Sequence, residues 1–345
     1  MASALRAGCV AALAVLGVAA LLVAAAGAPI GQTFGLLLSG GFGSVFALTE
    51  TLTRAIPLMF TGLAATVAFK ARLFNIGAEG QLYAGAIAAV AVGTSGAGWP
   101  VPLLFVAMLL AAAAAGGLLL LGPAVLKLRW GVDEVVSTLL LNFVVLLGVG
   151  ALLDGPMKDA SAMGWPQSVA LPAELELARL VAQTRMHTGL LGSVAAAVLL
   201  WLLLRFTTLG FAIRALGANA RAAAFAGVPI GRTMVCVALL SGGLAGLAGA
   251  VEVAGRAGYV TLDMSPGYGY TGIVIAMLAH LNPLAVVGAS VLVAGVLVGA
   301  DSMSRAIGVP SYLADVVVAS AMLAVLTASM LTRYRLRFGA GGAPP

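Results

Sequence analysis

The chain has 345 residues, of which 62% are hydrophobic and only 9% are charged, whereas soluble globular domains carry roughly 25% charged residues. Lysine and arginine outnumber aspartate and glutamate by 18 to 12. This composition excludes a soluble domain. The basic residues lie in short segments between apolar runs and form no patch with interleaved aromatic residues, so we expect no binding to nucleic acid.

The apolar runs are unbroken, as in membrane helices, whereas the strands of a membrane β-barrel would alternate apolar and polar residues. A helical span needs about 20 apolar residues. We therefore predict an all-α integral membrane protein, a polytopic bundle of about ten transmembrane helices that forms one transmembrane domain over residues 1–345. The expected spans cover approximately residues 8–28, 51–69, 75–92, 101–121, 133–153, 189–206, 233–251, 268–280, 284–300 and 312–331.

Several local features refine this pattern. Pro57 should break the second span, residues 29–49 should form an extracytoplasmic loop with a short interfacial helix, and residues 252–266 should return the chain to the surface. At about 1.5 Å per residue, 268–280 is short for a crossing and is expected to be broken or re-entrant. The spacing of small residues predicts close helix contact at Gly242, Gly246 and Gly249, and again at Gly295 and Gly299, which are four apart.

The distribution of basic residues predicts the orientation. With the N-terminus in the cytoplasm, 12 of the 18 basic residues lie on the cytoplasmic side, as the positive-inside rule requires. The six exceptions are Arg54, Lys158, Arg179, Arg185, Arg256 and Arg305. An even number of spans leaves both termini cytoplasmic, with a cytoplasmic loop at 207–232 and an extracytoplasmic insertion at 154–187 that should hold a short amphipathic helix.

Residues 70–81 form a polar segment where an apolar span should begin, with Asn75, Glu79 and Gln81 at membrane depth. Such groups are costly unless they face protein or a water-filled path. They either brace the helices or serve function, and the residues alone do not decide between the two. Asp133 and Glu134 open the fifth span, where the helix dipole favours acidic side chains.

No catalytic or metal-binding arrangement is expected. Gly267 to Gly272 match G-x-G-x-x-G, but the strand and acidic residue of a dinucleotide site are missing, so these glycines predict close packing or a helix break. No Gly-Lys pair occurs, so the chain cannot form a P-loop, and any ATP must bind another polypeptide. His187, His280, Cys9 and Cys236 are scattered, which predicts neither a metal site nor a disulfide.

The 207–232 segment carries Arg214, Arg221 and Arg232 and no acidic residue. Residues 218–226 favour a short helix, which Gly227 and Pro229 should end. This pattern favours a docking element for another protein, with an ordinary solvated loop as the alternative.

The string Phe74-Asn75-Ile76-Gly77-Ala78-Glu79-Gly80-Gln81 resembles the signature of permease subunits of bacterial ABC importers for nucleosides and simple sugars, within the branched-chain amino acid and ribose permease group. The resemblance runs from about residue 54 to the last span. The other stretches that carry it are 57–63, 133–143, 208–229, 241–250 and 267–270.

This resemblance implies a transport subunit and not an enzyme, in the bacterial cytoplasmic (inner) membrane and in contact with its lipid. The implied partners are an ABC ATPase, a second homologous permease and an extracytoplasmic substrate-binding protein. No cofactor would bind this chain, because the ATPase uses the ATP and Mg²⁺. The solute would be a small polar molecule, a nucleoside or simple sugar.

The resemblance assigns candidate residues of a coupling surface, and the polar residues of the apolar spans are the candidates for a translocation path. Those of the coupling surface for the ATPase are Arg214, Gly217, Asn219, Ala222, Ala223 and Gly227. Those that would shape the translocation path are Asn75, Glu79, Gln81, Glu134 and Asn142.

Two other classes of protein stay open. A proton-coupled secondary transporter would use Glu79 as its ion site and work without an ATPase. A membrane-embedded enzyme would need a convergent polar site.

Overall fold

The computed structural model describes residues 29–96 and 98–307, with a few single positions beyond them. The expected spans at 8–28 and 312–331, and the basic residues Arg333, Arg335 and Arg337, therefore lie outside the described ranges. The described part of the chain is helical and contains no strand, only three isolated β-bridges.

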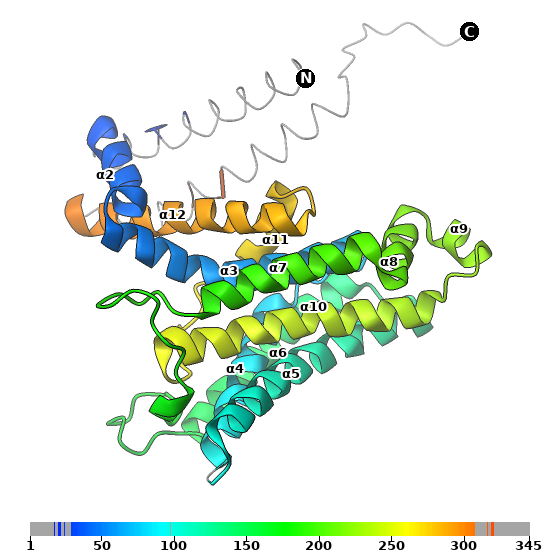
Figure 1. Ribbon diagram of the computed structural model, residues 1–345, viewed down its shortest axis with the longest axis horizontal. Coiled ribbons are helices and arrows are strands. Elements are labelled where there is room, and N and C mark those ends of the chain that lie inside the picture. Colours follow the sequence, from blue (N-terminus) through cyan, green and yellow to red (C-terminus); the bar gives the residue numbers. More distant parts are fainter. Residues whose placement is uncertain are drawn as a thin grey trace, which may run out of the picture. The chain divides into compact units, whose positions relative to one another are not determined.

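Figure 1 shows the order of the helices. The α-helices are α2 (Ile30–Phe42), α3 (Val45–Lys70), α4 (Ala78–Ser95), α5 (Val101–Trp130), α6 (Glu134–Asp154), α7 (Gly189–Phe206), α8 (Thr208–Ala218), α9 (Ala220–Phe225), α10 (Ile230–Glu252), α11 (Tyr268–Leu278) and α12 (Pro283–Ile307). A 3-10 turn, η1, covers Ala173–Leu175, and a π-helix, η2, continues α10 over Val253–Ala257.

Six helices within the described ranges are long and apolar enough to cross a membrane: α3, α5, α6, α7, α10 with η2, and α12. This confirms a helical, multi-pass protein. Helix α4 is not among the six, because polar residues such as Glu79 and Gln81 lower the hydropathy of its 18 residues. The total of about ten spans and the side on which the termini lie stay predictions.

The chain divides into two compact units, one of residues 48–294 and one that contains α2 and α12 from residue 295 onward. In the second unit, α2 packs directly on α12. A Cβ atom on Gly299 would lie 2.0 Å from the Leu37 carbonyl oxygen, and one on Gly41 would lie 2.3 Å from that of Gly295. The close contact predicted at Gly295 and Gly299 is confirmed.

In the unit of residues 48–294, α4 is the buried central helix and contacts α5, α6, α10 and α11. Helix α10 approaches its neighbours backbone to backbone. A Cβ atom on Gly246 would lie 2.2 Å from the carbonyl oxygen of Ala112 in α5, and one on Gly249 would lie 2.0 Å from that of Leu82 in α4. The predicted packing of small residues along α10 is confirmed.

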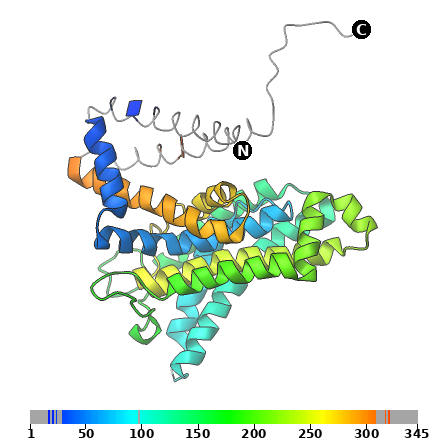
Figure 2. The same ribbon diagram turned by 45° about the horizontal axis from the view of Figure 1, so that its top comes forward.

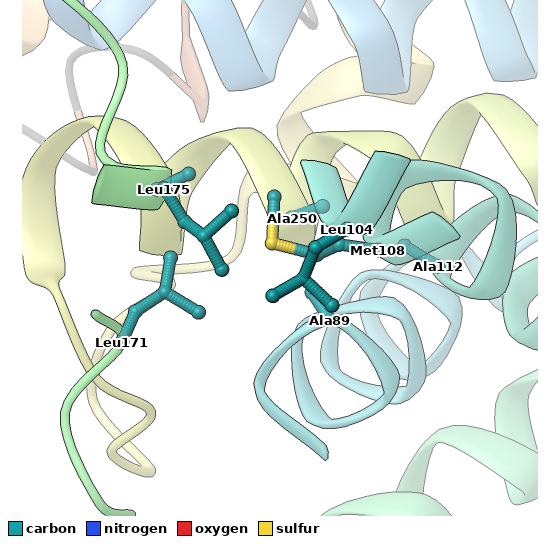
Figure 3. Packing of buried hydrophobic residues seen from close by; sticks show 8 residues of the cluster. Ala89, Leu104, Met108, Ala112, Leu171, Leu175 and Ala250 are labelled. Atoms are coloured by element: carbon teal, nitrogen blue, oxygen red, sulfur yellow. The ribbon is translucent and has the colours of Figure 1, made fainter. Parts of the chain in front are cut away.

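The insertion after α6 is anchored on the same bundle. Leu171 and Leu175 pack against Met108 of α5, Ala89 of α4 and Ala250 of α10 (Figure 3). Backbone hydrogen bonds also tie the insertion to the segment that follows α10. The predicted amphipathic helix is here only the three-residue turn η1.

Three local predictions were wrong. Helix α3 runs through Pro57 without a break, which neighbouring groups permit in a membrane helix by satisfying the freed backbone. At 29–49 the expected short helix is present, but α2 has 13 residues and α3 already begins at Val45, so little of the expected loop remains. Glu252 is 2% exposed and lies inside the bundle, not at the surface, where its carboxylate pairs with Arg256 one turn further along the helix.

The unit of residues 48–294 has two structurally different ends. Helices α8 and α9 lie at one end, and the insertion lies at the other (Figures 1 and 2). Helix α11 has only 11 residues, about 16 Å at 1.5 Å per residue. It is too short to cross a bilayer, as the sequence indicated.

Candidate functional site

The polar segment forms a break between α3 and α4. The chain leaves the helix at Lys70, Arg72 takes a left-handed conformation (φ 55°), and α4 begins at Ala78. Irregular backbone inside a membrane bundle must find its hydrogen bonds within the protein. The side chains predicted to shape a path supply many of them.

Asn75 and Gln81 form a double amide pair inside the bundle. Asn75 Nδ2 donates to Gln81 Oε1 (2.8 Å), and Gln81 Nε2 donates to Asn75 Oδ1 (2.9 Å). Asn75 also donates to the Ser241 hydroxyl (3.1 Å) and accepts from the Gly77 N–H (2.9 Å). The Ser241 hydroxyl in turn donates to the Ala64 carbonyl (2.8 Å), so the pair joins the break to α10 and α3.

Asn142 holds the same break from α6. Its Oδ1 accepts from the Gly80 N–H (2.8 Å), and its Nδ2 donates to the Ile76 carbonyl (2.9 Å) and to the Tyr270 hydroxyl (3.1 Å). One turn earlier, the Thr138 hydroxyl accepts from the Ile76 N–H (3.2 Å). Helix α6 thus replaces the hydrogen bonds that a continuous helix would have made.

Glu134 holds the beginning of the break. Its carboxylate accepts from the Phe74 N–H (3.1 Å) and pairs with the ammonium of Lys127. Lys127 Nζ also donates to the Arg72 carbonyl (3.0 Å). Asp133 caps α6 by accepting from the Val135 N–H (2.8 Å), which confirms its predicted role at a helix N-terminus.

Glu79 points to the start of α11. Its carboxylate accepts from the Gly269 N–H (2.6 Å) and has further hydrogen bonds from the Ser265 side chain and the Gly267 N–H. A Cβ atom on Gly269 would lie 2.2 Å from the Glu79 nitrogen, so only glycine fits there. Gly269 and Gly272 therefore serve close packing, as predicted, whereas Gly267 precedes α11 with a left-handed φ of 83°. The Glu79 carboxyl group accepts its hydrogen bond at the N-terminus of this short helix.

All five candidate path residues are at least 95% buried. The structure brings them together around the break and α11, and gives each of them protein partners. Their contact with a solute stays a prediction. The five are Asn75, Glu79, Gln81, Glu134 and Asn142.

The predicted coupling segment is a pair of helices and not a single one. Thr207 caps α8 by accepting from the Gly210 N–H (3.0 Å). Asn219 separates the helices and caps α9 by accepting from the N–H groups of Arg221 (3.0 Å) and Ala222 (3.1 Å). The helix predicted at 218–226 is confirmed, whereas α8 was not predicted.

The six candidate coupling residues divide into two groups. Ala223 is 4% exposed, and a Cβ atom on Gly217 would lie 1.8 Å from the Lys70 carbonyl oxygen, so both residues pack inward. Four are exposed at the end of the unit, namely Arg214, Asn219, Ala222 and Gly227, and Gly227 has a φ of 81°.

The sequence did not lead us to predict one cluster of charged side chains, which surrounds Arg256. Arg256 NH1 lies 2.8 Å from Glu252 Oε1 and 3.4 Å from the Tyr268 hydroxyl, and Glu50 and Arg54 of α3 interact with the same group. A signal was available, because Arg54 and Arg256 were two of the six basic residues that did not fit the cytoplasmic side. Within the described ranges, no three His, Cys, Asp or Glu side chains gather as a metal site.

The chain is similar to permeases of known transporters over nearly its whole length. Residues 47–326 match the family described as branched-chain amino acid transport system / permease component. The glucose ABC transporter permease protein TsgB13 of Haloferax volcanii is 37% identical over 94% of this chain and 87% of its own. The guanosine ABC transporter permease protein NupP of Bacillus subtilis is 34% identical over 95% of this chain and 93% of its own length.

A third relative is the nucleoside ABC transporter permease protein NupB of Lactococcus lactis, 28% identical over 82% of this chain and 80% of its own. Among solved structures, a metal-chelate type ABC transporter in an inward-facing conformation covers 83% of this chain at 16% identity, with a TM-score of 0.43. That structural likeness is too low to add to the assignment. The extent and identity of the sequence matches are sufficient: the chain belongs to the branched-chain amino acid transport system permease family, as a membrane transport subunit and not as an enzyme.

Proposed function

We propose that the chain is one transmembrane half of an ABC importer for a nucleoside or a simple sugar. The observation that carries this proposal is its similarity, over 94% and 95% of its length, to the permeases of a glucose and a guanosine transporter. The match favours an ATP-driven importer over a proton-coupled transporter that uses Glu79. In the structure that carboxylate is engaged by the start of α11.

Helices α8 and α9 fit the role of the docking surface for an ABC ATPase. They join α7 to α10 and lie together at one end of the unit (Figure 1). Phe225 is 99% exposed and Phe211 60% exposed, and Arg214 and Ala222 are exposed beside them. Large aromatic side chains with positive charge nearby are typical of protein interfaces.

The contacts of α8 supply a route from this surface into the bundle. Gly217 lies against the Lys70 carbonyl at the end of α3, directly before the break. Two residues further along the chain, the Arg72 carbonyl accepts a hydrogen bond from Lys127. Lys127 also forms an ion pair with Glu134. A displacement of α8 by the ATPase would therefore move the end of α3 and the break together.

The remaining parts of the importer follow from this assignment. A second homologous permease would complete the path, and a binding protein would deliver solute from outside, next to the 154–187 insertion. ATP and Mg²⁺ would bind the ATPase. Both termini and α8–α9 would be cytoplasmic, in a bacterial cytoplasmic membrane with about ten spans per chain, and the five buried polar residues would shape the path by holding the break.

The test is purification of the tagged protein from its native membranes, together with uptake of radiolabelled guanosine and glucose by intact cells, where the binding protein is present, with and without depletion of ATP. Ala222→Arg places a long charged side chain on the exposed face of α9, whereas Ala223 is buried and its replacement would disturb the packing of the helix. The matched control is Ala178→Arg, also exposed but in the insertion.

We expect a P-loop ATPase to co-purify with the wild type and with Ala178→Arg, and to be lost with Ala222→Arg. ATP-driven uptake of at least one probe should follow the same pattern. The proposal is overturned if no ATPase accompanies the wild-type protein, or if neither probe is taken up with ATP.

A further inference from the structure

The charged residues of α3, α10 with η2, and α11 form one group, here named the α3–α10 charge cluster: Glu50, Arg54, Glu252, Arg256 and Tyr268. The ion pair between Arg256 and Glu252 is 2.8 Å long. The Tyr268 hydroxyl lies 3.4 Å from Arg256 and also bonds the Arg54 side chain. Glu50 interacts electrostatically with Arg256. The break and the path candidates do not include any of these residues.

The cluster lies within membrane-spanning helices. Glu50 and Arg54 follow the start of α3, Val45, by five and nine residues, about 8 and 14 Å along a helix axis. Glu252 closes α10 and is 2% exposed. Charged groups at such positions face protein or a water-filled cavity rather than lipid.

The cluster is open on one side. The Arg256 side chain is 35% exposed while its partner Glu252 is 2% exposed, and Glu50 and Arg54 are partly exposed as well. Because a guanidinium group does not face hydrocarbon, this open side faces protein or water. Arg256 is the last residue but one of its candidate span, so this water is either the bulk solvent or that of a translocation path.

Arg256 lies in an irregular turn of the backbone at the end of α10. Residues 253–257 form a π-helix, a rare widening that is frequent at functional sites. A Cβ atom on Gly255 would lie 2.2 Å from the His187 ring, so the insertion packs directly on this turn. The buried Glu252 then fixes the guanidinium from the other side, as a positioning residue.

The chemistry of the cluster selects a class of ligand. It has two cations, two anions and one phenol, so its net charge is zero. The cluster has no excess charge that would favour an anion or a cation, whereas vicinal hydroxyl groups can accept from a guanidinium and donate to a carboxylate. Glucose and guanosine, named in the relatives, both carry such hydroxyls on a ring.

We propose that the α3–α10 charge cluster binds the ring hydroxyls of an uncharged solute during its passage, with Arg256 as the contacting donor. The proposal rests on the proposed importer function and adds a contact site to it. Its ligand class is a pentose or hexose ring with adjacent hydroxyls.

The test measures the affinity of the membrane complex itself. The purified permease–ATPase complex, without the binding protein, is titrated with guanosine and with 2′,3′-dideoxyguanosine by saturation-transfer NMR, and with glucose and 2-deoxyglucose in parallel. Arg256→Gln should raise the Kd for the hydroxylated probe by about tenfold, the worth of one charge-assisted hydrogen bond. The Kd for the deoxy probe should change less than about twofold.

Two further variants secure this result. Arg256→Lys keeps the ion pair with Glu252 but loses the planar fork, so it should show the same selective loss to a smaller degree even if Arg256→Gln does not fold. The control Arg305→Gln removes another exposed arginine, outside the cluster, and should change neither Kd.

The outcomes separate the two proposals. Equal changes for the hydroxylated and deoxy probes would reduce Arg256 to a structural residue and overturn the cluster proposal alone. A wild-type complex that transports a probe with ATP but does not bind it in the titration would do the same. Absence of ATP-driven uptake in the wild type would instead overturn the importer.

Discussion

At the scale of single residues, the buried polar side chains serve the backbone. The break between α3 and α4 leaves N–H and C=O groups that a helix would have paired, and inside a membrane bundle such groups need other partners. Asn142 alone makes three hydrogen bonds, two of them to the backbone of Ile76 and Gly80. Amide side chains suit this task because each one both donates and accepts.

Replacing Asn142 by Ala should therefore destabilise the protein, because the Gly80 N–H and the Ile76 carbonyl lose their partner. Each buried group left unpaired costs about 1–3 kcal/mol. We expect a clear fall in the unfolding temperature in detergent, measured by fluorescence-detected size-exclusion chromatography after heating.

The control for this prediction is Thr66→Val. The Thr66 hydroxyl is buried and has no hydrogen-bond partner within the described residues, so its loss should leave the unfolding temperature unchanged or slightly raised. An Asn142→Ala protein as stable as the wild type would show that the hydrogen bonds at the break contribute little.

His187 predicts a dependence of stability on pH. Its ring is 1% exposed and its Nδ1 accepts from the Gly189 N–H (3.2 Å). Burial lowers the pKa of His187 from 6.5 to about 4. Between these values the unfolded chain binds a proton that the folded chain does not, so this residue's stabilising contribution is full above pH 6.5 and is lost as the pH falls towards 4.

The measurement compares the unfolding temperature of the wild type and of His187→Asn between pH 7.5 and 4.5. Asparagine keeps an acceptor for Gly189 but does not titrate. We expect a smaller fall with decreasing pH in the variant, and parallel curves for the two proteins would contradict the role of His187.

At the scale of helices, small residues rather than large apolar ones decide the packing. Within a membrane, apolar side chains gain little by leaving lipid, so helices associate where their backbones approach closely. Gly246 of α10 illustrates this, since a Cβ atom there would lie 2.2 Å from the Ala112 carbonyl oxygen. Helix α10 can contact both α4 and α5 only because such positions carry no side chain.

Gly246→Ala should separate α5 from α10 and destabilise the protein by about 1–3 kcal/mol, the usual cost of overpacking. Gly192→Ala in α7 is the matched control, because a Cβ atom there meets nothing within 4 Å. That control should gain up to roughly 1 kcal/mol from helix propensity. The check is the apparent unfolding temperature in detergent, and an equal response of both variants would refute the packing argument.

At the scale of the whole molecule, the insertion and the α8–α9 pair lie at opposite ends of the 48–294 unit (Figure 2). This arrangement predicts opposite sides of the membrane for them, with α9 in the cytoplasm according to the distribution of basic residues. Cys236 and Cys9 are first replaced by serine, and single cysteines are then introduced by Ala178→Cys and Ala222→Cys.

A membrane-impermeant maleimide should label the cysteine at 178 in intact cells and the one at 222 only after the membrane is opened. Labelling of both in detergent serves as the control for reactivity. Labelling at 222 in intact cells would reverse the proposed orientation and with it the site of ATPase docking.

The sequence by itself determined the class of protein, the approximate position of most helices and the family. These depend on composition, apolar run length and short strings such as 74–81, which are local properties of the chain. It also indicated which polar residues need partners within the protein, because a polar group is costly wherever it stands in an apolar run. The Asp133 cap and the helix at 218–226 were predictable for the same reason: their hydrogen bonds are local.

Only the tertiary structure decided what those polar residues contact. Glu79 meets Gly269 across 190 residues of sequence, and Asn75 meets Ser241 across 166. The burial of Glu252 could likewise not be predicted, because it depends on α3 and α11, whose Arg54 and Tyr268 lie near its carboxyl group. Periodicity and composition describe one helix at a time, whereas these contacts arise from close backbone approach between helices far apart in the chain.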